Sequence, residues 1–276
     1  PDRSLLLQPA GTPYGGHVSR ADLLQLEVST DSGLGERARL GVIVLESDHT
    51  LEAELRAPDI DGVDHYVSRI ANDSTITPDS LTAMEERLPL AAALLPVELR
   101  LDAIGYGCTS AATLIGEEGI EAALNSAHPG VPCTNPITAA VAAFAALGVS
   151  RIGIVAPYTA DVTDRIVRHL KSAGLDVVAV GSFLEPDDHV VARITEGAVA
   201  DGVAIVADSD GCEGVFVSCT SLRTFGVLAD LEERLDRPVV SSNLALTWHL
   251  LRLAGVDDQV PGLGRLFTAG IYRGNG

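Results

Sequence analysis

The sequence carries few positive charges for its length. Its 276 residues include 19 Lys and Arg against 38 Asp and Glu, and the formal net charge is −19. Because nucleic-acid binding depends on clustered Lys and Arg that neutralise phosphates, this balance argues against a nucleic-acid-binding protein. The same net charge repels anionic membranes and anionic small molecules at long range. Any anionic ligand must therefore be held by local groups.

Long apolar segments are also missing. A membrane-spanning helix needs about 20 consecutive apolar residues, and the longest nearly uncharged segment, residues 132–150, is interrupted by a proline and by Gly148. Residues 1–16 are too short and too rich in Gly and Pro to be the hydrophobic region of a secretory signal, and they are typical of a flexible arm. We therefore expect a cytoplasmic protein without membrane contact, with an N-terminal arm over residues 1–37.

Aromatic residues make up only 4% of the chain, so the core must consist mainly of Ala, Val, Leu and Ile. A hydrophobic content of 46% and a charged content of 21% are typical of a globular protein. The cysteines, Cys108, Cys133, Cys212 and Cys219, form no Cys-x-x-Cys pair. Without an export signal, we expect them to be free thiols in a reducing compartment.

Motifs for metals and cofactors are absent as well. The seven histidines form no His-x-His or His-Glu-x-x-His pattern. Glycine pairs such as Gly262 and Gly264 do not follow a strand in the register of a dinucleotide-binding site. The Gly-x-Ser-x-Gly motif of serine hydrolases is not found. We therefore expect neither a metal ion nor a cofactor.

The sequence does contain an alternation of short β-rich runs and helical patterns. Most β-rich runs are continuously apolar, as in strands that are buried on both faces of a parallel sheet. We expect strands at residues 40–45, 101–106, 151–156, 176–180, 214–218 and 238–241. We expect helices at residues 78–95, 137–147, 159–172, 194–208, 222–235 and 244–253. This order predicts an α/β fold with mostly parallel, doubly wound sheets.

An internal repeat is the most informative feature. Residues 107–116 and 218–226 both follow an apolar run, and both contain Cys-Thr-Ser-x-x-Thr. Each copy continues into a second short run, an Asn and a helix that ends at Gly-Val. The period is too long for a solenoid. The repeat predicts two similar α/β halves that face each other about a pseudo-twofold axis, the first formed by residues 38–135 and 243–276 and the second by residues 136–242.

The repeat places Cys108 and Cys219 after a strand and before a helix, at the sheet edge where α/β proteins bind ligands. A helix N-terminus there lowers the pKa of a thiol and can hold a carboxylate without Lys or Arg. If the halves face each other, one thiolate can remove an α-proton while the other thiol protonates the opposite face. Alternatively, a thiolate can add to an activated double bond. The competing interpretation is a pair of buried core cysteines, which we adopt for Cys133 and Cys212.

Three motifs resemble the aspartate/glutamate racemase superfamily. They are Gly-Tyr-Gly-Cys-Thr-Ser at 105–110, Val-Ser-Cys-Thr-Ser at 217–221, and Pro-Val-Val-Ser-Ser-Asn at 238–243, followed by Trp248. The resemblance extends over residues 38–270. It points to the branch that holds maleate cis-trans isomerases, arylmalonate decarboxylases and the ectoine-utilisation EutA proteins. It implies a cofactor-independent enzyme with a carboxylate-binding cleft between two pseudo-symmetric α/β halves.

The resemblance also implies roles for individual residues. Cys108 and Cys219 match the two catalytic cysteines of the branch. Decarboxylases of this branch have glycine at the first position, so the presence of both cysteines favours an isomerase or racemase. Tyr158 matches a tyrosine whose hydroxyl contacts the substrate carboxylate, although an ordinary core tyrosine is the alternative. The other residues expected to bind substrate beside the cysteines are Thr109, Ser110, Thr220 and Ser221.

Asp48 falls where maleate isomerases carry a substrate-binding Asn. A carboxylate at this position repels a second substrate carboxylate and can hold an ammonium group, which favours a diaminobutyrate-type substrate as in the EutA branch. The alternative is that Asp48 caps a turn. We expect Asn135 and Asn243 to be helix N-caps rather than ligands. Residues 185–188 contain no Asn that matches the second one of maleate isomerases, so we assign no substrate-binding residue there.

We therefore expect a cofactor-independent isomerase or racemase that acts on a small carboxylate such as an amino acid. One alternative is a maleate cis-trans isomerase or an arylmalonate-type decarboxylase. Another is a non-catalytic, two-lobed carboxylate-binding protein. We expect a homo-oligomer, either a dimer or a tetramer, with no nucleic-acid or membrane partner.

Overall fold

The computed structural model describes residues 25–73 and 78–269, and the chain divides into two compact units, residues 1–33 and 34–276. In the first unit, the described residues are exposed and form no helix or strand. All described helices and strands belong to the second unit. The flexible arm expected over residues 1–16 lies outside the described residues.

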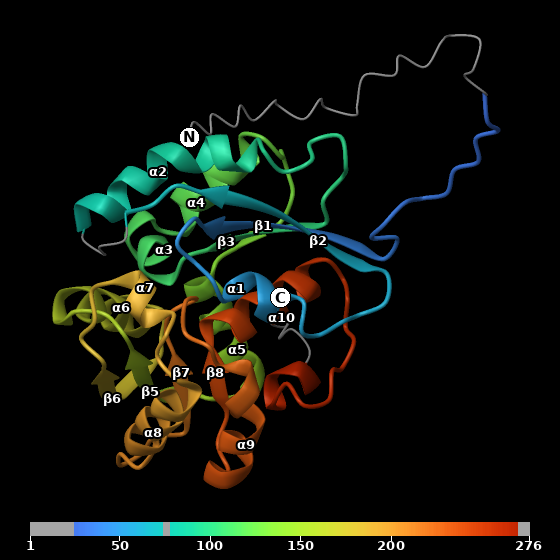
Figure 1. The fold of residues 1–276 in the computed structure, drawn as a ribbon. Helices are drawn as coiled ribbons and strands as arrows, with labels where there is room; N and C mark the ends of the chain where they lie inside the picture. Colours follow the sequence, from blue (N-terminus) through green and yellow to red (C-terminus); the bar gives the residue numbers. More distant parts are fainter. Residues whose placement is uncertain (1–24, 74–77, 270–276) are drawn as a thin grey trace, which may run out of the picture. The chain divides into compact units, whose positions relative to one another are not determined.

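Two four-stranded parallel sheets form the framework of the second unit (Figure 1). The first sheet has the order β2-β1-β3-β4 and consists of β1 (Ala38–Leu45), β2 (Val63–Ile70), β3 (Ala103–Gly107) and β4 (Cys133–Thr134). The second has the order β6-β5-β7-β8 and consists of β5 (Arg151–Ala156), β6 (Asp176–Ser182), β7 (Gly214–Val217) and β8 (Val239–Ser241). The two orders are equivalent, which confirms the α/β fold and the repeat of one topology.

Helices flank both sheets. They are α1 (Leu51–Leu55), α2 (Pro78–Ala92), α3 (Thr109–Ile115), α4 (Glu117–Asn125), α5 (Pro136–Leu147), α6 (Ala160–Ser172), α7 (Asp188–Val191), α8 (Glu196–Ala207), α9 (Phe225–Leu235) and α10 (Ser242–Leu253), followed by a 3-10 turn at Arg265–Thr268. Figure 1 shows α5 and α10 between the two sheets. These helices pack against each other, and most of α10 is buried. The contact between the two halves therefore belongs to the hydrophobic core.

The strand pattern explains which elements could be predicted. Strands β3, β7 and β8 are buried at every residue, in agreement with their apolar sequences. The prediction missed β2, an edge strand that is only partly buried and carries Asp64 and His65. It also missed the two-residue strand β4 and the short helices α1, α4 and α7, whereas the helix expected after Cys108 is α3. A rule that selects continuously apolar runs overlooks edge strands and elements of a few residues.

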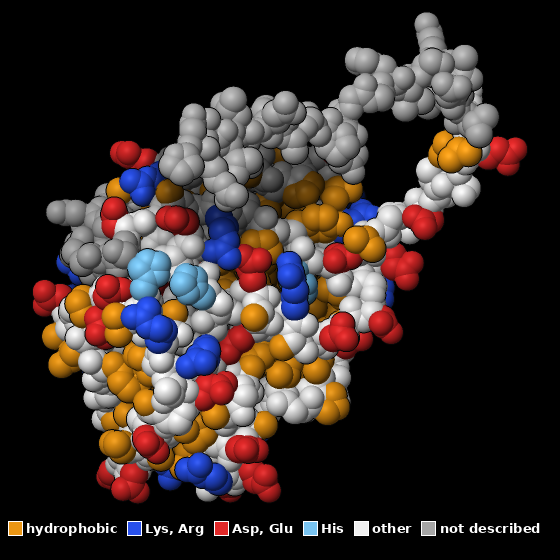
Figure 2. Space-filling view, in the orientation of Figure 1, with side chains coloured by type: hydrophobic (Ala, Val, Ile, Leu, Met, Phe, Trp, Pro, Cys, Tyr) orange, Lys and Arg blue, Asp and Glu red, His pale blue; other side chains and the backbone are white. Residues whose placement is uncertain are grey.

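Acidic side chains account for the net charge of the chain, and they lie mainly at the surface. Figure 2 shows them interspersed with apolar and scattered basic side chains over the visible face. Among the described residues, no helix combines the length and apolarity that crossing a membrane requires.

Candidate active site

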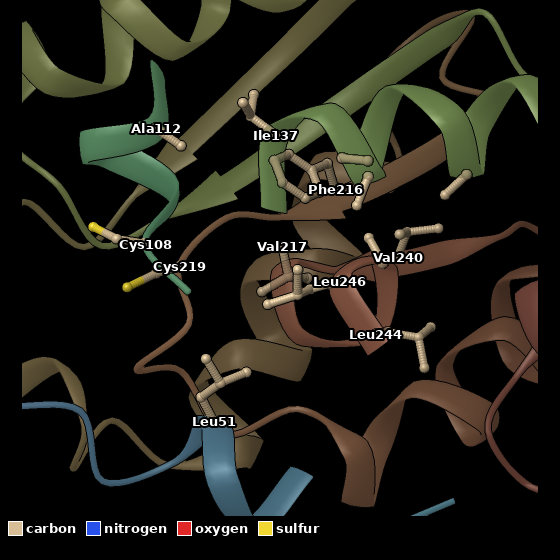
Figure 3. Close-up of a cluster of buried hydrophobic side chains, with 14 of the residues drawn as sticks. Leu51, Cys108, Ala112, Ile137, Phe216, Val217, Cys219, Val240, Leu244 and Leu246 are labelled. Carbon is tan, nitrogen blue, oxygen red and sulfur yellow. The ribbon is translucent and has the colours of Figure 1, made fainter. Parts of the chain in front are cut away.

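Two equivalent strand ends bring Cys108 and Cys219 to one cavity. Cys108 directly follows β3, and Cys219 lies two residues after β7. The cavity has a volume of about 20 Å³, which is room for about one water molecule. Its lining residues are Leu45, Asn72, Asp73, Met84, Cys108, Thr109, Ser110, Tyr158, Asp188, Cys219, Thr220 and Ser221. In Figure 3 the two sulfur atoms point away from the neighbouring apolar cluster. A substrate must widen this cavity to bind.

Cys108 is the N-cap of α3. Its sulfur accepts a hydrogen bond from the backbone N–H of Ala111 at 3.4 Å and lies 3.6 Å from the Ser110 hydroxyl. Burial nevertheless raises the pKa of the Cys108 thiol to about 11. The expected lowering of this pKa is therefore wrong for the closed cavity, because desolvation of the thiolate outweighs one N–H at the start of a seven-residue helix.

Cys219 shows the same effect more strongly. Burial raises the pKa of its thiol, and the nearby charge of Asp188 raises it further. A hydrogen bond with the Tyr158 side chain opposes this rise. Tyr158 is itself buried against the cavity, in contact with the thiol. In the closed cavity both cysteines are therefore protonated thiols at neutral pH.

The backbone of Cys219 is unusual. Its φ is +150°, in the region that favours glycine, whereas Cys108 has an ordinary extended φ of −146°. The Cys219 N–H donates to Ser242 Oγ at 3.0 Å, and the same oxygen lies 2.9 Å from Thr109 Oγ1. Ser242 thus joins the two Cys-Thr-Ser loops and holds the strained one.

The four hydroxyl residues of the Cys-Thr-Ser loops all line the cavity, as do the two cysteines and Tyr158. Their hydroxyls already have protein partners. Thr220 Oγ1 donates to the Gly107 carbonyl at 3.4 Å, and Ser221 Oγ donates to Asp188 Oδ1 at 2.8 Å. The structure thus brings these predicted residues together, and the hydroxyls of Thr220 and Ser221 connect the loop to its surroundings.

Asp48 lies close enough to the two cysteines for its charge to raise the pKa of both thiols. It is buried, but it is not among the described residues that line the cavity. Its Oδ1 accepts hydrogen bonds from the N–H groups of Thr50 at 2.7 Å and Leu51 at 2.8 Å, at the start of α1. Its Oδ2 is buried without a hydrogen-bond partner, and burial raises the pKa of the carboxyl. The geometry favours the turn-capping alternative.

Asp188 is a buried carboxylate that lines the cavity, and the sequence analysis missed it. It is 3% exposed and accepts hydrogen bonds from Ser221 of its own half and from Ser47 of the other half. Asn72 donates to Ser47 Oγ at 2.9 Å and completes this side of the cavity. Asp188 lies six residues after β6, in the Pro-Asp-Asp segment where the sequence was considered only for a matching Asn.

Asn243 is not an N-cap, which corrects the prediction. Helix α10 starts at Ser242, two residues before the predicted start, and its N-cap is Ser241, whose Oγ accepts from Leu244 N at 3.1 Å. The Asn243 amide instead donates to Glu54 Oε2 and to the Thr220 carbonyl. Asn135 is the N-cap of α5, as predicted.

The remaining cysteines lie outside the cavity. Cys212 is buried and donates to the Gly214 carbonyl, whereas Cys133 is partly exposed near Asn125. All four cysteines are free thiols. Within the described ranges, no group of three or more His, Cys, Asp and Glu is arranged to hold a metal ion.

The fold and the cavity define a two-lobed α/β protein with paired cysteines at equivalent strand ends. The family model of arylmalonate decarboxylase matches residues 74–267, and the chain therefore belongs to this family. Its curated relatives include the maleate isomerase of Pseudomonas putida, which is 26% identical over 249 residues, covering 85% of this chain and 98% of the relative.

Solved structures share the fold. A mutant of Nocardia farcinica maleate cis-trans isomerase with a covalently bound succinylcysteine intermediate has a TM-score of 0.76 and 21% identity, covering 83% of this chain and 98% of its own. A double mutant of arylmalonate decarboxylase in the liganded form has a TM-score of 0.75 and 27% identity, covering 84% and 99%. The comparisons support this family, whereas the assignment to its EutA branch stays a prediction.

Proposed function

We propose that the chain is a cofactor-independent isomerase of a small carboxylate and that Cys108 and Cys219 are its two reactive thiols. One observation carries the proposal: the two cysteines come from equivalent strand ends of two halves and line the same cavity. The similarity to maleate isomerase supports the reaction class. A decarboxylase needs one thiol to protonate its product, so the second thiol favours isomerisation.

For an unsaturated dicarboxylate such as maleate, the steps balance without a co-reactant. The sulfur of one cysteine, as thiolate, forms a bond to one alkene carbon, and the π electrons move to the neighbouring carbon, next to its carboxylate. The other thiol protonates that carbon. Rotation about the new single bond, return of the proton and cleavage of the C–S bond then release the trans isomer. The succinylcysteine in the Nocardia farcinica enzyme is the kind of adduct that the first two steps form.

Opening of the cavity supplies the thiolate. Burial is the main cause of the raised pKa of both thiols. A cavity of about 20 Å³ must widen to admit a substrate, and widening exposes the sulfur atoms to water or to the polar substrate. The pKa of each thiol then falls towards its ordinary value. Reactive thiolate therefore forms more readily in the open site, where water reaches the sulfur atoms, than in the closed one.

Asp188 favours a second candidate, racemisation of a carboxylate that carries an ammonium group. A dicarboxylate would place its second negative charge in a cavity that already holds the buried Asp188 carboxylate. An ammonium group would instead be attracted to it. One thiolate would remove the α-proton and the other thiol would protonate the opposite face, so that each cysteine ends in the state in which the other began. Diaminobutyrate derivatives fit this description.

Proton NMR in deuterated water tests both candidates with one set of samples. The protein is incubated separately with maleate, phenylmalonate, amino acids and diaminobutyrate derivatives. Fumarate formation supports the first candidate, and loss of the α-proton signal supports the second. Cys108→Ser and Cys219→Ser should each abolish turnover, whereas Cys212→Ser, which changes a buried cysteine outside the cavity, should not.

Three outcomes would contradict or redirect the proposal. Full turnover in either Cys108→Ser or Cys219→Ser would exclude a two-thiol mechanism. Decarboxylation alone, with one dispensable cysteine, would indicate the one-thiol reaction. If ligand protects the thiols from iodoacetamide but no substrate exchanges a proton or isomerises, the chain is a carboxylate-binding protein instead.

A further inference from the structure

Helix α1 of the first half contacts the Cys219 loop of the second half. The Thr50 hydroxyl, at the start of α1, donates to the Ser221 carbonyl at 2.9 Å. Glu54, near the end of the same helix, is 8% exposed and points its carboxylate at the segment that follows the loop. The side chains of Thr50, the N-cap of α1, and of Glu54 within this helix therefore reach the backbone around Cys219 from outside its own half.

The Glu54 carboxylate is fully hydrogen-bonded. Its Oε1 accepts from the backbone N–H groups of Thr224 at 2.6 Å and Phe225 at 2.9 Å. Its Oε2 accepts from the Thr224 hydroxyl at 3.1 Å and from Asn243 Nδ2 at 2.7 Å. Burial raises the pKa of Glu54, while these donors oppose the rise. A buried carboxylate with this many donors holds its partners in one arrangement.

Asn243 carries the constraint from Glu54 to the Cys219 loop. The nitrogen that donates to Glu54 also donates to the Thr220 carbonyl at 2.9 Å. Its Oδ1 is buried without a partner, so its protein hydrogen bonds are made by the Nδ2 group. The Glu54 carboxylate only accepts hydrogen bonds, so the Asn243 amide turns its NH₂ group towards it. The same NH₂ group then also faces the Thr220 carbonyl and donates to it.

Together these contacts hold the backbone directly after the strained cysteine. Cys219 has a φ of +150°, which costs free energy for any residue with a side chain. The next two carbonyl groups are held by hydrogen bonds. Asn243 donates to the Thr220 carbonyl, and Thr50 donates to the Ser221 carbonyl. Releasing either bond lets the loop relax and moves the thiol.

We infer that Glu54 is a positioning residue that sets the place of the Cys219 thiol through Asn243 and the Thr220 carbonyl. Its effect on turnover rests on the proposed function. Its effect on the thiol itself does not, because the hydrogen bonds exist whichever substrate the cavity takes. The consequence is that the first half of the chain determines the geometry of the reactive cysteine in the second half.

Glu54→Gln tests this link at constant size. The carbonyl oxygen of the new amide takes the place that accepts two backbone N–H groups, and its NH₂ group then faces the Asn243 Nδ2 donor. Asn243 must turn its oxygen towards position 54, which also presents an acceptor to the Thr220 carbonyl. The bond to Thr220 is lost while the helix and the fold remain.

The measurement is the iodoacetamide reaction rate of each cysteine, followed by peptide mass spectrometry, with Cys108 as the internal reference. In Glu54→Gln we expect the rate at Cys219 to rise about fivefold relative to Cys108, the factor that corresponds to one lost buried hydrogen bond. With a confirmed substrate, kcat should fall about tenfold with little change in KM, because the variant misplaces the thiol but leaves the groups that bind the substrate unchanged.

Two further variants separate positioning from general stability. Asn243→Asp leaves only acceptors opposite Glu54 and the Thr220 carbonyl, so it should raise the Cys219 rate as Glu54→Gln does. Thr50→Val removes the bond to the Ser221 carbonyl at nearly constant volume and should raise the Cys219 rate in the same direction, even if Glu54→Gln does not fold.

Glu232→Gln is the matched control. Glu232 is also buried, and its carboxylate also accepts two backbone N–H groups, from Val239 and Arg265, away from the cavity. An unchanged ratio of Cys219 to Cys108 rates in both Glu54→Gln and Thr50→Val, or an equal change in Glu232→Gln, would overturn the inference. If no substrate is found, the rate ratio still decides the positioning role, so its failure is distinct from failure of the proposed function.

Discussion

The Ser221 hydroxyl donates a 2.8 Å hydrogen bond to Asp188 Oδ1, and this bond holds a buried carboxylate at the wall of the cavity that contains both cysteines. Ser47, from the other half, donates to the second oxygen of the same carboxylate. Asp188 therefore joins the two halves, and its charge contributes to the raised pKa of both thiols.

Removing this charge should make both thiols more acidic. A carboxylate beside a thiol disfavours the thiolate, so Asp188→Asn lowers the pKa of Cys108 and Cys219. Even half a pKa unit raises the thiolate fraction about threefold at a pH below the pKa. We expect at least this increase in the iodoacetamide reaction rate at pH 8, together with a shift of the pH profile to lower pH.

Asp187→Asn is the control for the effect of Asp188. Asp187 is exposed and its Oδ1 accepts from His189 N as the N-cap of α7, a role that Asn also performs. Identical pH profiles for wild type and Asp188→Asn, or equal shifts in the two variants, would show that Asp188 does not control the thiols.

The two cysteines should differ in their tolerance of glycine. At position 219, where φ is +150°, glycine relieves backbone strain in the folded chain. At position 108, where φ is −146°, glycine relieves no strain and only increases the conformational entropy of the unfolded chain. Both substitutions remove a buried thiol, so that loss largely cancels in the comparison. Urea unfolding should show that Cys219→Gly is more stable than Cys108→Gly by about 1 kcal/mol. Equal stability, or the reverse order, would mean that the φ of Cys219 is not strained.

The N-cap of α5 should stabilise the fold without affecting the thiols. Asn135 Oδ1 accepts from the N–H groups of Ile137 at 3.0 Å and Thr138 at 3.1 Å. Asn135→Ala should lower the free energy of unfolding by about 1 kcal/mol, and Asn135→Ser should retain most of it because serine also caps. Denaturant unfolding measures both. A changed Cys219 alkylation rate in Asn135→Ala would show that the core helix, too, positions the loop.

Acid should destabilise the chain in part through His249. Burial lowers the pKa of this imidazole to about 4, and its Nδ1 lies 2.7 Å from Thr134 Oγ1. Between about pH 6.5 and pH 4 the unfolded chain binds a proton that the folded chain does not. The free energy of unfolding therefore falls as the pH is lowered through this range, by up to about 3 kcal/mol.

His249→Gln removes this titration. The variant has no imidazole at this position, so only the wild type loses stability when its unfolded chain binds the proton. The difference in the free energy of unfolding between wild type and variant should therefore shrink as the pH falls from 7 to about 4.5. Urea unfolding at both pH values measures the difference. A difference that does not depend on pH would show that His249 titrates alike in the folded and unfolded chain.

Local sequence patterns were sufficient for much of the architecture. The strand at Arg151–Ala156 was predicted at its observed bounds, since a buried parallel strand is continuously apolar. The repeated Cys-Thr-Ser segments predicted two halves with one topology and placed both cysteines at strand ends, because a strand followed by a helix is itself a local pattern. The edge strand β2 escaped, since its partly exposed sequence mixes polar and apolar residues.

Only the tertiary structure decided what surrounds the thiols. Sequence reasoning weighed a helix N-terminus near Cys108, but the pKa depends more on how completely the folded chain excludes water, and that raises it. The roles of Asp188 and Glu54 depend on the fold for the same reason: each side chain acts on residues far away in the chain, Asp188 on Ser47 and Glu54 on Thr224 and Asn243. By itself, the sequence determined the α/β class, the repeat and the placement of the two cysteines at strand ends. Burial and long-range hydrogen bonds, which arise when the halves pack together, determined the chemistry available to them.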